Sequence, residues 1–121
     1  MKKDNESKEM YLETILVLFK KNGYVRSIDI SEELGYSRAS VSRAMSDLKK
    51  EEFISVDKSH FIKLTEKGQA LAEKILDRHR LVSKMLVKLG VSEEIAEEDA
   101  CRIEHIISDE TYEAVKKHFD A

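Results

Sequence analysis

The chain has 121 residues, a length that fits one domain, or a small domain with a helical extension that pairs with a second copy, and that excludes a large enzyme core. Its composition, with 41% hydrophobic and 37% charged residues, four Gly and no Pro or Trp, favours helices over a turn-rich barrel or sandwich. The net charge of −3 is unevenly spread: residues 20–67 carry ten Lys/Arg against eight Asp/Glu, whereas residues 68–121 carry eight Lys/Arg against twelve Asp/Glu. The first part therefore suits contact with phosphates, and the second suits binding of a cation or a partner.

The first half of the chain has the pattern of a helix-turn-helix. Apolar residues recur at helical spacing over residues 7–21, and the Asn-Gly pair that follows ends this first helix. Ser27 is placed to cap a short second helix that ends at Gly35, and Ser37 is placed to cap a third helix that runs to residue 52. A short helix, a Gly-containing turn and a further helix, in this order, predict a helix-turn-helix.

A β-hairpin follows the predicted helix-turn-helix. Phe53–Val56 and Phe61–Leu64 are short runs rich in β-forming residues, and a polar turn at residues 57–60 joins them. The hairpin is the predicted two-stranded wing. With the three helices before it, it predicts a winged-helix DNA-binding domain over residues 1–65.

The second half is predicted to be all helical. Thr65 is placed to cap a long helix over residues 66–88, and Ser92 is placed to cap a helix over residues 93–107. A final helix over residues 109–119 follows Ser108. These helices carry more apolar positions than so small a domain buries alone, which predicts a homodimer. We therefore expect a mainly α fold, with residues 66–121 as an all-helical dimerisation domain.

The third helix is the predicted recognition helix. Val41, Met45 and Leu48 form its apolar stripe, and the opposite face is short, polar and basic. Short serine side chains let the backbone approach phosphates, while arginines reach base edges or phosphate oxygens. The predicted DNA-binding residues of this face and of the wing are Ser37, Arg38, Ser40, Ser42, Arg43, Lys58 and Lys63. The alternative is a charged, solvated face on a small helical bundle.

The segment around the only cysteine has the spacing of a metal site. Cys101, Glu104 and His105 stand at i, i+3 and i+4, so on a helix a thiolate, a carboxylate and an imidazole share one face. This mixed donor set suits Fe(II), Co(II), Ni(II) or Zn(II) better than Mg(II) or Ca(II). The alternative is that Cys101 is a buried small hydrophobe and that His105 is a hydrogen-bonded or exposed side chain.

Other helices offer further ligands for the same ion. His79 lies on the long predicted helix, and Met10 and Glu13 are three residues apart on one face of the first helix. A thioether or a carboxylate from the first helix would complete the coordination shell.

Four segments follow one another over nearly the whole chain: EMYLETI, DISEELGYSRASVSRAMSDLKKEEFI, LTEKGQALAEKILDRHRL and DACRIEHIISDE. Together, in this order, they resemble the diphtheria toxin repressor and manganese transport regulator family of metal-dependent repressors. The resemblance implies a winged-helix domain, a helical dimerisation domain and a metal site that bridges the two. It also implies the compact two-domain form, without the SH3-like third domain of longer members.

The resemblance also assigns individual ligands. The matches to the main regulatory site of the iron-responsive members are Met10, Cys101, Glu104 and His105. His79 matches the ancillary-site histidine of the family, and Glu13 matches a ligand position of the manganese-responsive members. Two positions depart from the pattern, since Ser83 replaces an ancillary carboxylate and Glu97 replaces an ancillary histidine. The ancillary site is therefore either altered or formed by Glu13, His79 and Glu97.

These observations predict a metal-dependent repressor, not an enzyme, that binds operator DNA as a homodimer and controls metal-ion homeostasis. The sequence contains no apolar run of membrane-spanning length and no secretory leader, so we expect a cytoplasmic protein without a membrane partner. The soft donors Met10 and Cys101 favour Fe(II) as the activating ion, while Glu13 keeps Mn(II) possible. The alternatives are a metal-independent winged-helix regulator that answers to another effector, and a small metalloenzyme with Glu104 as general base.

Overall fold

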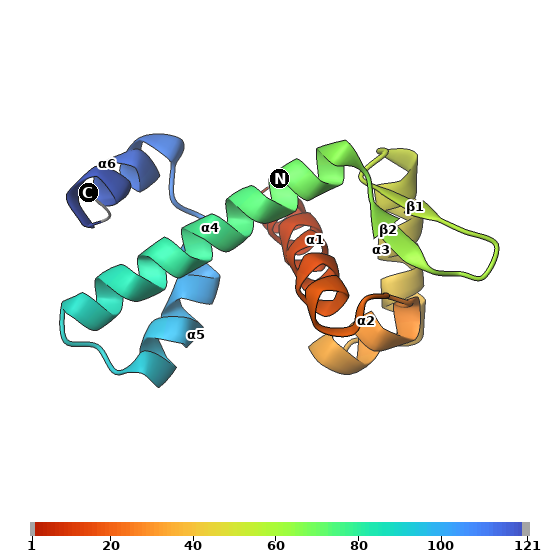
Figure 1. The fold of residues 1–121 in the computed structure, drawn as a ribbon, viewed down its shortest axis with the longest axis horizontal. Coiled ribbons are helices and arrows are strands. Elements are labelled where there is room, and N and C mark those ends of the chain that lie inside the picture. The colour runs from red at the N-terminus through yellow and green to blue at the C-terminus, as the bar shows by residue number, and fades with distance from the viewer. Residues whose placement is uncertain (1, 120–121) are drawn as a thin grey trace. The chain divides into compact units, whose positions relative to one another are not determined.

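The computed structural model describes the backbone of residues 2–119 and the side chains of residues 7–119. The elements in chain order are α1 (Lys2–Asn22), α2 (Ser27–Leu34), α3 (Arg38–Lys50), β1 (Ile54–Val56), β2 (Ile62–Leu64), α4 (Glu66–Lys88), α5 (Glu93–Ile103) and α6 (Asp109–Phe119) (Figure 1). The chain divides into two compact units. Ser7–Glu73 form the N-terminal unit, and the described residues from Lys74 onward, with residues 2–6, form the C-terminal unit. The domain boundary at residue 65, which the sequence suggests, stays a prediction.

Three helices and the hairpin build the N-terminal unit. Leu12, Ile15 and Leu16 of α1 are fully buried, as are Ile30 of α2 and Val41 of α3. Burying side chains of this size contributes about 1.5–3 kcal/mol each, so the apolar faces of these helices hold the unit together. The mainly helical fold with a winged helix-turn-helix is confirmed.

The turn between α2 and α3 follows the predicted capping chemistry. Gly35 adopts the left-handed conformation (φ 71°), and its N–H donates to the Ser31 carbonyl (2.9 Å). Ser37 caps α3 as predicted, because its Oγ accepts a hydrogen bond from the Ser40 N–H (3.1 Å). This tight turn fixes where α3 begins.

The predicted cap of α2 was wrong by one residue. Arg26, not Ser27, has the extended backbone of an N-cap (φ −126°, ψ 162°), and Ser27 is the first helical residue. The Asp29 carboxylate, three residues inside the helix, accepts a hydrogen bond from the Arg26 N–H (2.9 Å). Asp29 therefore supplies the N3 half of a capping box, with Arg26 as the N-cap residue.

The wing is an antiparallel hairpin with Ile54 opposite Leu64 and Ser55 opposite Lys63. Alternate side chains point to opposite faces, so Ile54 and Ile62 are buried while Ser55 and Lys63 are exposed. Both strands begin one residue later than predicted. The reason is that the N–H groups of Phe53 and Phe61 donate outside the ladder, to the Leu48 carbonyl (2.9 Å) and to Asp57 Oδ1 (3.0 Å).

The second unit contains α4 from Lys74 onward, with α5 and α6 beside it (Figure 1). Its buried apolar side chains are Ile75, Leu81, Val82, Ala96 and Ala100. Arg78 of α4 holds the start of α6, because its guanidinium donates to the Ile107 carbonyl (3.1 Å), pairs with Asp109 and lies 5.1 Å from the Tyr112 ring centroid.

The predicted cap of α5 is confirmed, and Ser108 caps α6. The Ser92 Oγ accepts from the Ile95 N–H (3.4 Å), and the Ser108 Oγ accepts from the Thr111 N–H (3.1 Å). However, α5 ends at Ile103 and not at residue 107, because the Ile106 N–H donates to the Ile103 carbonyl three residues back (3.0 Å), where an α-helix would use the carbonyl four residues back. Within residues 2–119, no helix is both long and apolar enough to cross a membrane.

Candidate metal centre and DNA-binding surface

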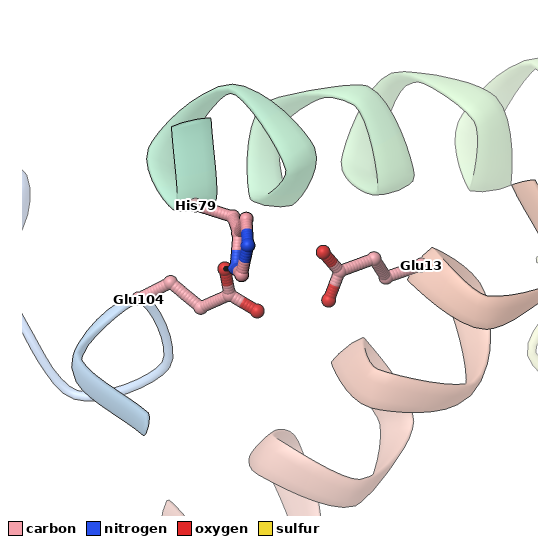
Figure 2. A group of neighbouring side chains, drawn as sticks. All are labelled: Glu13, His79 and Glu104. Atoms are coloured by element: carbon pink, nitrogen blue, oxygen red, sulfur yellow. Dashed lines mark ion pairs between the residues drawn. The ribbon is translucent and has the colours of Figure 1, made fainter. Parts of the chain in front are cut away.

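A chain of imidazoles and carboxylates lies in the C-terminal unit. His79 of α4 stands between two glutamates, with Nε2 2.8 Å from Glu97 Oε2 and Nδ1 2.8 Å from Glu104 Oε2. On the far side of Glu104, its Oε1 lies 3.2 Å from His105 Nε2. Figure 2 shows the His79 ring and the Glu104 carboxylate pointing toward each other from α4 and from the end of α5. We call these four residues the imidazole–carboxylate cluster.

Helix periodicity explains how α5 contributes to the cluster. Glu97 and Glu104 are seven residues apart, about two turns, so they share one face of the helix. Ala100 lies between them on that face and is fully buried. A small residue at this position leaves room for the histidine of the neighbouring helix between the two carboxylates.

The electrostatics of the cluster centre on Glu104. Its side chain has 0% exposure, and the His79 side chain is 15% exposed. A buried carboxylate is costly unless cations and hydrogen-bond donors surround it. The Glu104 carboxylate, which accepts from the protonated His79 ring, raises the pKa of His79 to about 9; burial lowers this pKa, and the Glu97 carboxylate raises it further. The folded protein thus places a positive charge beside this carboxylate.

The donor set fits a divalent transition-metal ion. The imidazole of His79 and the carboxylate of Glu104 supply nitrogen and oxygen donors of the kind that Mn(II), Fe(II) and Zn(II) accept, whereas Mg(II) and Ca(II) prefer oxygen alone. Glu97 and Glu104 lie at opposite nitrogens of the His79 ring, so an ion at Nδ1 would take Glu104 and one at Nε2 would take Glu97. The same ion would replace the positive charge that the His79 proton otherwise provides. The fit rests on the buried carboxylate and on the imidazoles at both of its oxygens.

Cys101, Glu104 and His105, which were predicted to share one helix face, lie in different surroundings in the structure. Glu104 and His105 lie together, and the His105 side chain is only 8% exposed. Cys101 is exposed on α5, about 100° around the helix from the buried Ala100. Within residues 7–119, its sulfur belongs to no group of three His, Cys, Asp or Glu ligand atoms within 4.8 Å of one another.

The remaining predicted ligands are Met10, Glu13 and Glu97. Met10 and Glu13 are half-buried on α1, in the N-terminal unit; Glu13 is labelled in Figure 2. Glu97 lies in the cluster, where its Oε1 also accepts a hydrogen bond from the Ser83 hydroxyl (3.3 Å). Sequence reasoning treated Ser83 only as a missing ligand, although its one-turn spacing from His79 placed both side chains on one face of α4.

The predicted recognition helix exposes the residues that the sequence suggested. Ser37, Arg38, Ser42 and Arg43 are exposed, and Ser40 is half-buried. The buried Val41, Met45 and Leu48 lie on the opposite face. Ser37 is already used locally, since its hydroxyl donates to Ser40 Oγ (3.0 Å) as well as capping the helix. Arg38 and Arg43 are therefore the long exposed side chains of α3 that can extend to a DNA base or phosphate.

The tip of the wing is rigidly built and basic. Asp57 Oδ1 accepts hydrogen bonds from the N–H groups of Ser59 (2.9 Å) and Phe61 (3.0 Å), and His60 adopts a positive φ of 68° to close the turn. Lys58 and Lys63 are exposed beside this turn. A fixed hairpin with exposed lysines suits contact with a phosphate backbone.

Comparison with known proteins identifies the same two regions. A family model described as the iron dependent repressor, N-terminal DNA binding domain matches residues 5–60. A second, described as the iron dependent repressor, metal binding and dimerisation domain, matches residues 65–120. The HTH-type transcriptional regulator MntR of Geobacillus kaustophilus is 36% identical over 102 residues, which cover 84% of this chain and 72% of the relative.

Solved structures with the same fold include the manganese regulator SloR, with a TM-score of 0.82 and 31% identity. Another is ScaR with bound Zn²⁺, with a TM-score of 0.79 and 30% identity. Each match covers 93% of this chain and 53% of the other, so the chain spans about half the length of these two proteins. The resemblance that the sequence motifs indicated is confirmed. The chain belongs to the iron-dependent repressor family, whose members are DNA-binding transcriptional regulators and not enzymes.

Proposed function

We propose that this protein is a metal-activated transcriptional repressor that binds operator DNA as a homodimer in the cytoplasm and controls metal-ion homeostasis. The observation that carries the proposal is the buried Glu104 carboxylate with an imidazole at each of its oxygens. Such an arrangement is a poor source of stability, because desolvation offsets the gain from ion pairing. It is a good receptor for a divalent cation.

His79 and Glu104 are the proposed core ligands, and Glu97, at the other nitrogen of His79, and His105, at the other oxygen of Glu104, are proposed as further ligands. Met10, Glu13 and Cys101 are proposed as further ligands on the basis of the family resemblance alone. A bound divalent ion supplies positive charge at the buried carboxylate and a set of directional bonds. Coordination by Met10 or Glu13 ties the first helix to the C-terminal domain and thereby restricts the hinge between residues 1–65 and 66–121. Metal binding can raise DNA affinity only by favouring the DNA-competent arrangement in this way.

Fe(II) and Mn(II) are the two proposed activators. Sulfur from Met10 and Cys101 favours Fe(II), whereas a site made of nitrogen and oxygen donors, with Glu13 added, suits Mn(II) equally well. The relative SloR is named a manganese regulator, and ScaR has been crystallised with Zn²⁺. Affinity in vitro follows the Irving–Williams order, so tight Zn(II) binding alone does not identify the physiological ion.

Operator binding is assigned to α3 and the wing. In a helix-turn-helix dimer, the two recognition helices enter successive major grooves, so we expect half-sites about 10 bp apart or a multiple of that distance. Arg38 and Arg43 are the proposed contacts to base edges, because arginine makes bidentate hydrogen bonds to guanine. Lys58 and Lys63 are the proposed contacts to phosphates.

The C-terminal unit is the proposed dimer interface. Its exposed large apolar side chains include Val87, Leu89, Ile95 and Ile106. A second copy of the chain would cover side chains of this kind. The matching family model is described as a dimerisation domain. Light scattering should give the mass of a dimer at micromolar concentration, and a monomer there would contradict this part of the proposal.

The proposal is tested by fluorescence-anisotropy titration of operator candidates under anaerobic conditions, first with chelator and then with Fe(II) or Mn(II). We expect metal to tighten binding at least tenfold, about 1.4 kcal/mol. Loss of the Fe(II) response in Cys101→Ala, with the Mn(II) response retained, would assign Cys101 to iron sensing. Loss of the Mn(II) response in Glu13→Ala, with the Fe(II) response retained, would assign Glu13 to manganese sensing. Equal DNA affinity with and without metal would refute the switch.

A further inference from the structure

The Met10 side chain contacts the turn that starts the recognition helix. The Tyr36 hydroxyl donates to the Met10 sulfur across 3.9 Å, and both residues belong to the N-terminal unit. The Tyr36 ring also meets the ring of Tyr11 edge-on, with centroids 6.1 Å apart. Two consecutive residues of α1 therefore hold one side chain of the turn between α2 and α3.

The backbone of Tyr36 is fixed just as closely. Its carbonyl accepts a hydrogen bond from the Ser31 hydroxyl of α2 (2.6 Å). The next residue, Ser37, caps α3 through the Ser40 N–H. The Tyr36 side chain is thus separated by one peptide unit from the first turn of the helix that carries Arg38 and Arg43.

We propose that Tyr36 is a positioning residue that couples metal coordination by Met10 to the start of the recognition helix. The inference rests on the proposed function, in which Met10 is a metal ligand. A thioether sulfur that donates a lone pair to a cation is a poorer hydrogen-bond acceptor, so coordination and the Tyr36 hydroxyl compete for the same sulfur. The contact therefore opposes metal binding, and coordination releases Tyr36 and the turn that it restrains.

Linkage fixes the sign of the expected effects. Tyr36→Phe removes the hydroxyl and keeps the ring against Tyr11. Because the contact stabilises only the arrangement in which Met10 is not a ligand, its loss should tighten metal binding about threefold, the size expected for a weak hydrogen bond. DNA affinity in chelator should rise by a similar factor, while the affinity of the metal-saturated protein stays the same.

The test is a double-mutant cycle with Met10→Leu, which removes the sulfur at nearly constant volume. Metal affinity by calorimetry and DNA affinity in chelator are measured for both single variants and the double variant. Tyr36→Phe should change both affinities in the Met10 background and neither in the Leu background. Tyr24→Phe, which removes another exposed hydroxyl of the same unit while its ring keeps its contact with Phe61, should leave both unchanged.

The outcomes separate this inference from the proposed function. The coupling is overturned if Tyr36→Phe changes neither metal affinity nor DNA affinity. It is also overturned if Tyr36→Phe changes them equally with Met10 and with Met10→Leu. Both outcomes count even when the wild-type protein responds fully to metal. If the wild-type protein shows no metal response, the proposed function fails. The unfolding midpoint in chelator then still tests the contact, because Tyr36→Phe should lower it only where Met10 is present.

Discussion

The Nδ1 atom of His79 lies 2.8 Å from Oε2 of Glu104, a side chain with no exposed surface. The two residues come from α4 and from the end of α5, 25 positions apart in the sequence. Because the histidine carries a proton in this pair, a cation is already part of the site. A divalent ion that replaces the proton binds a carboxylate that folding has already removed from water, and metal binding is then a proton-exchange reaction.

The stability of the metal-free protein should therefore depend on pH through His79. Its pKa in the folded protein is about 9, above the ordinary 6.5, so protonation stabilises the fold fully below pH 6.5. This contribution is lost as the pH rises from 6.5 through about 9. We expect the unfolding midpoint in chelator to fall across that window, and to fall less in His79→Gln. A wild-type midpoint that stays level or rises would contradict the assignment.

Arg78 should be a larger source of stability than its neighbour Arg80. The Arg78 side chain is 11% exposed and joins α4 to the Ile107 carbonyl, Asp109 and the Tyr112 ring, whereas the Arg80 side chain is 64% exposed. Lysine cannot reproduce this forked contact, so Arg78→Lys should cost about 2 kcal/mol. Arg80→Lys should change stability by less than about 0.5 kcal/mol. Urea unfolding followed by circular dichroism measures both, and equal effects would show that Arg78 does not anchor α6.

Gly68 should tolerate no side chain. An alanine Cβ at this position would overlap the Phe53 carbonyl oxygen and come within 3.3 Å of Leu64 Cδ2. Since that oxygen also accepts the Thr65 N–H (3.0 Å), it cannot move aside freely. We expect Gly68→Ala to destabilise the N-terminal unit by about 1–3 kcal/mol. Glu66→Ala, at an exposed position two residues earlier, is the control. A Gly68→Ala protein as stable as this control would show that the hairpin and α4 are not closely packed here.

The two arginines of α3 should carry sequence-specific DNA binding. Arg38→Ala or Arg43→Ala should each weaken operator binding by about 1–3 kcal/mol if the side chain is bidentate to a base. Lys63→Ala should instead weaken binding to all sequences alike and reduce its salt dependence. Arg102→Ala, an exposed arginine of α5, serves as the control. If metal-saturated Arg38→Ala and Arg43→Ala both bind the operator normally, α3 is not the recognition helix.

Local signals in the sequence predicted most of the fold. Ser37 and Ser92 cap their helices as expected because a cap depends only on the residue and the next three positions. Ser27 failed because Asp29 supplies an acceptor from inside the helix, and Arg26 then takes the cap position. The end of α5 was misplaced because apolar spacing continues through residues 103–107 while the backbone turns.

Less of the candidate metal site could be predicted from local sequence patterns. Spacing along one helix placed Cys101, Glu104 and His105 on a common face, but which part of that face is buried depends on how α5 packs beside α4. Ala100 and Glu104 are buried, which leaves Cys101 exposed. The contact of His79 with two glutamates is nonlocal, so spacing along the chain did not predict it; the family resemblance grouped His79 with Glu97, and the fold adds its contact with Glu104. The roles of Met10, Glu13 and Cys101 as ligands stay predictions.

The most direct test of the central claim is the gain in operator affinity on adding metal to Glu104→Gln, measured by anisotropy. The amide keeps the size of the side chain but cannot provide the charge that holds the ion. The account predicts that Mn(II) and Fe(II) then give less than a tenth of the wild-type gain, while Glu98→Gln, at an exposed position of the same helix, responds like wild type. A full metal response in a folded Glu104→Gln protein would show that the switch does not depend on this carboxylate.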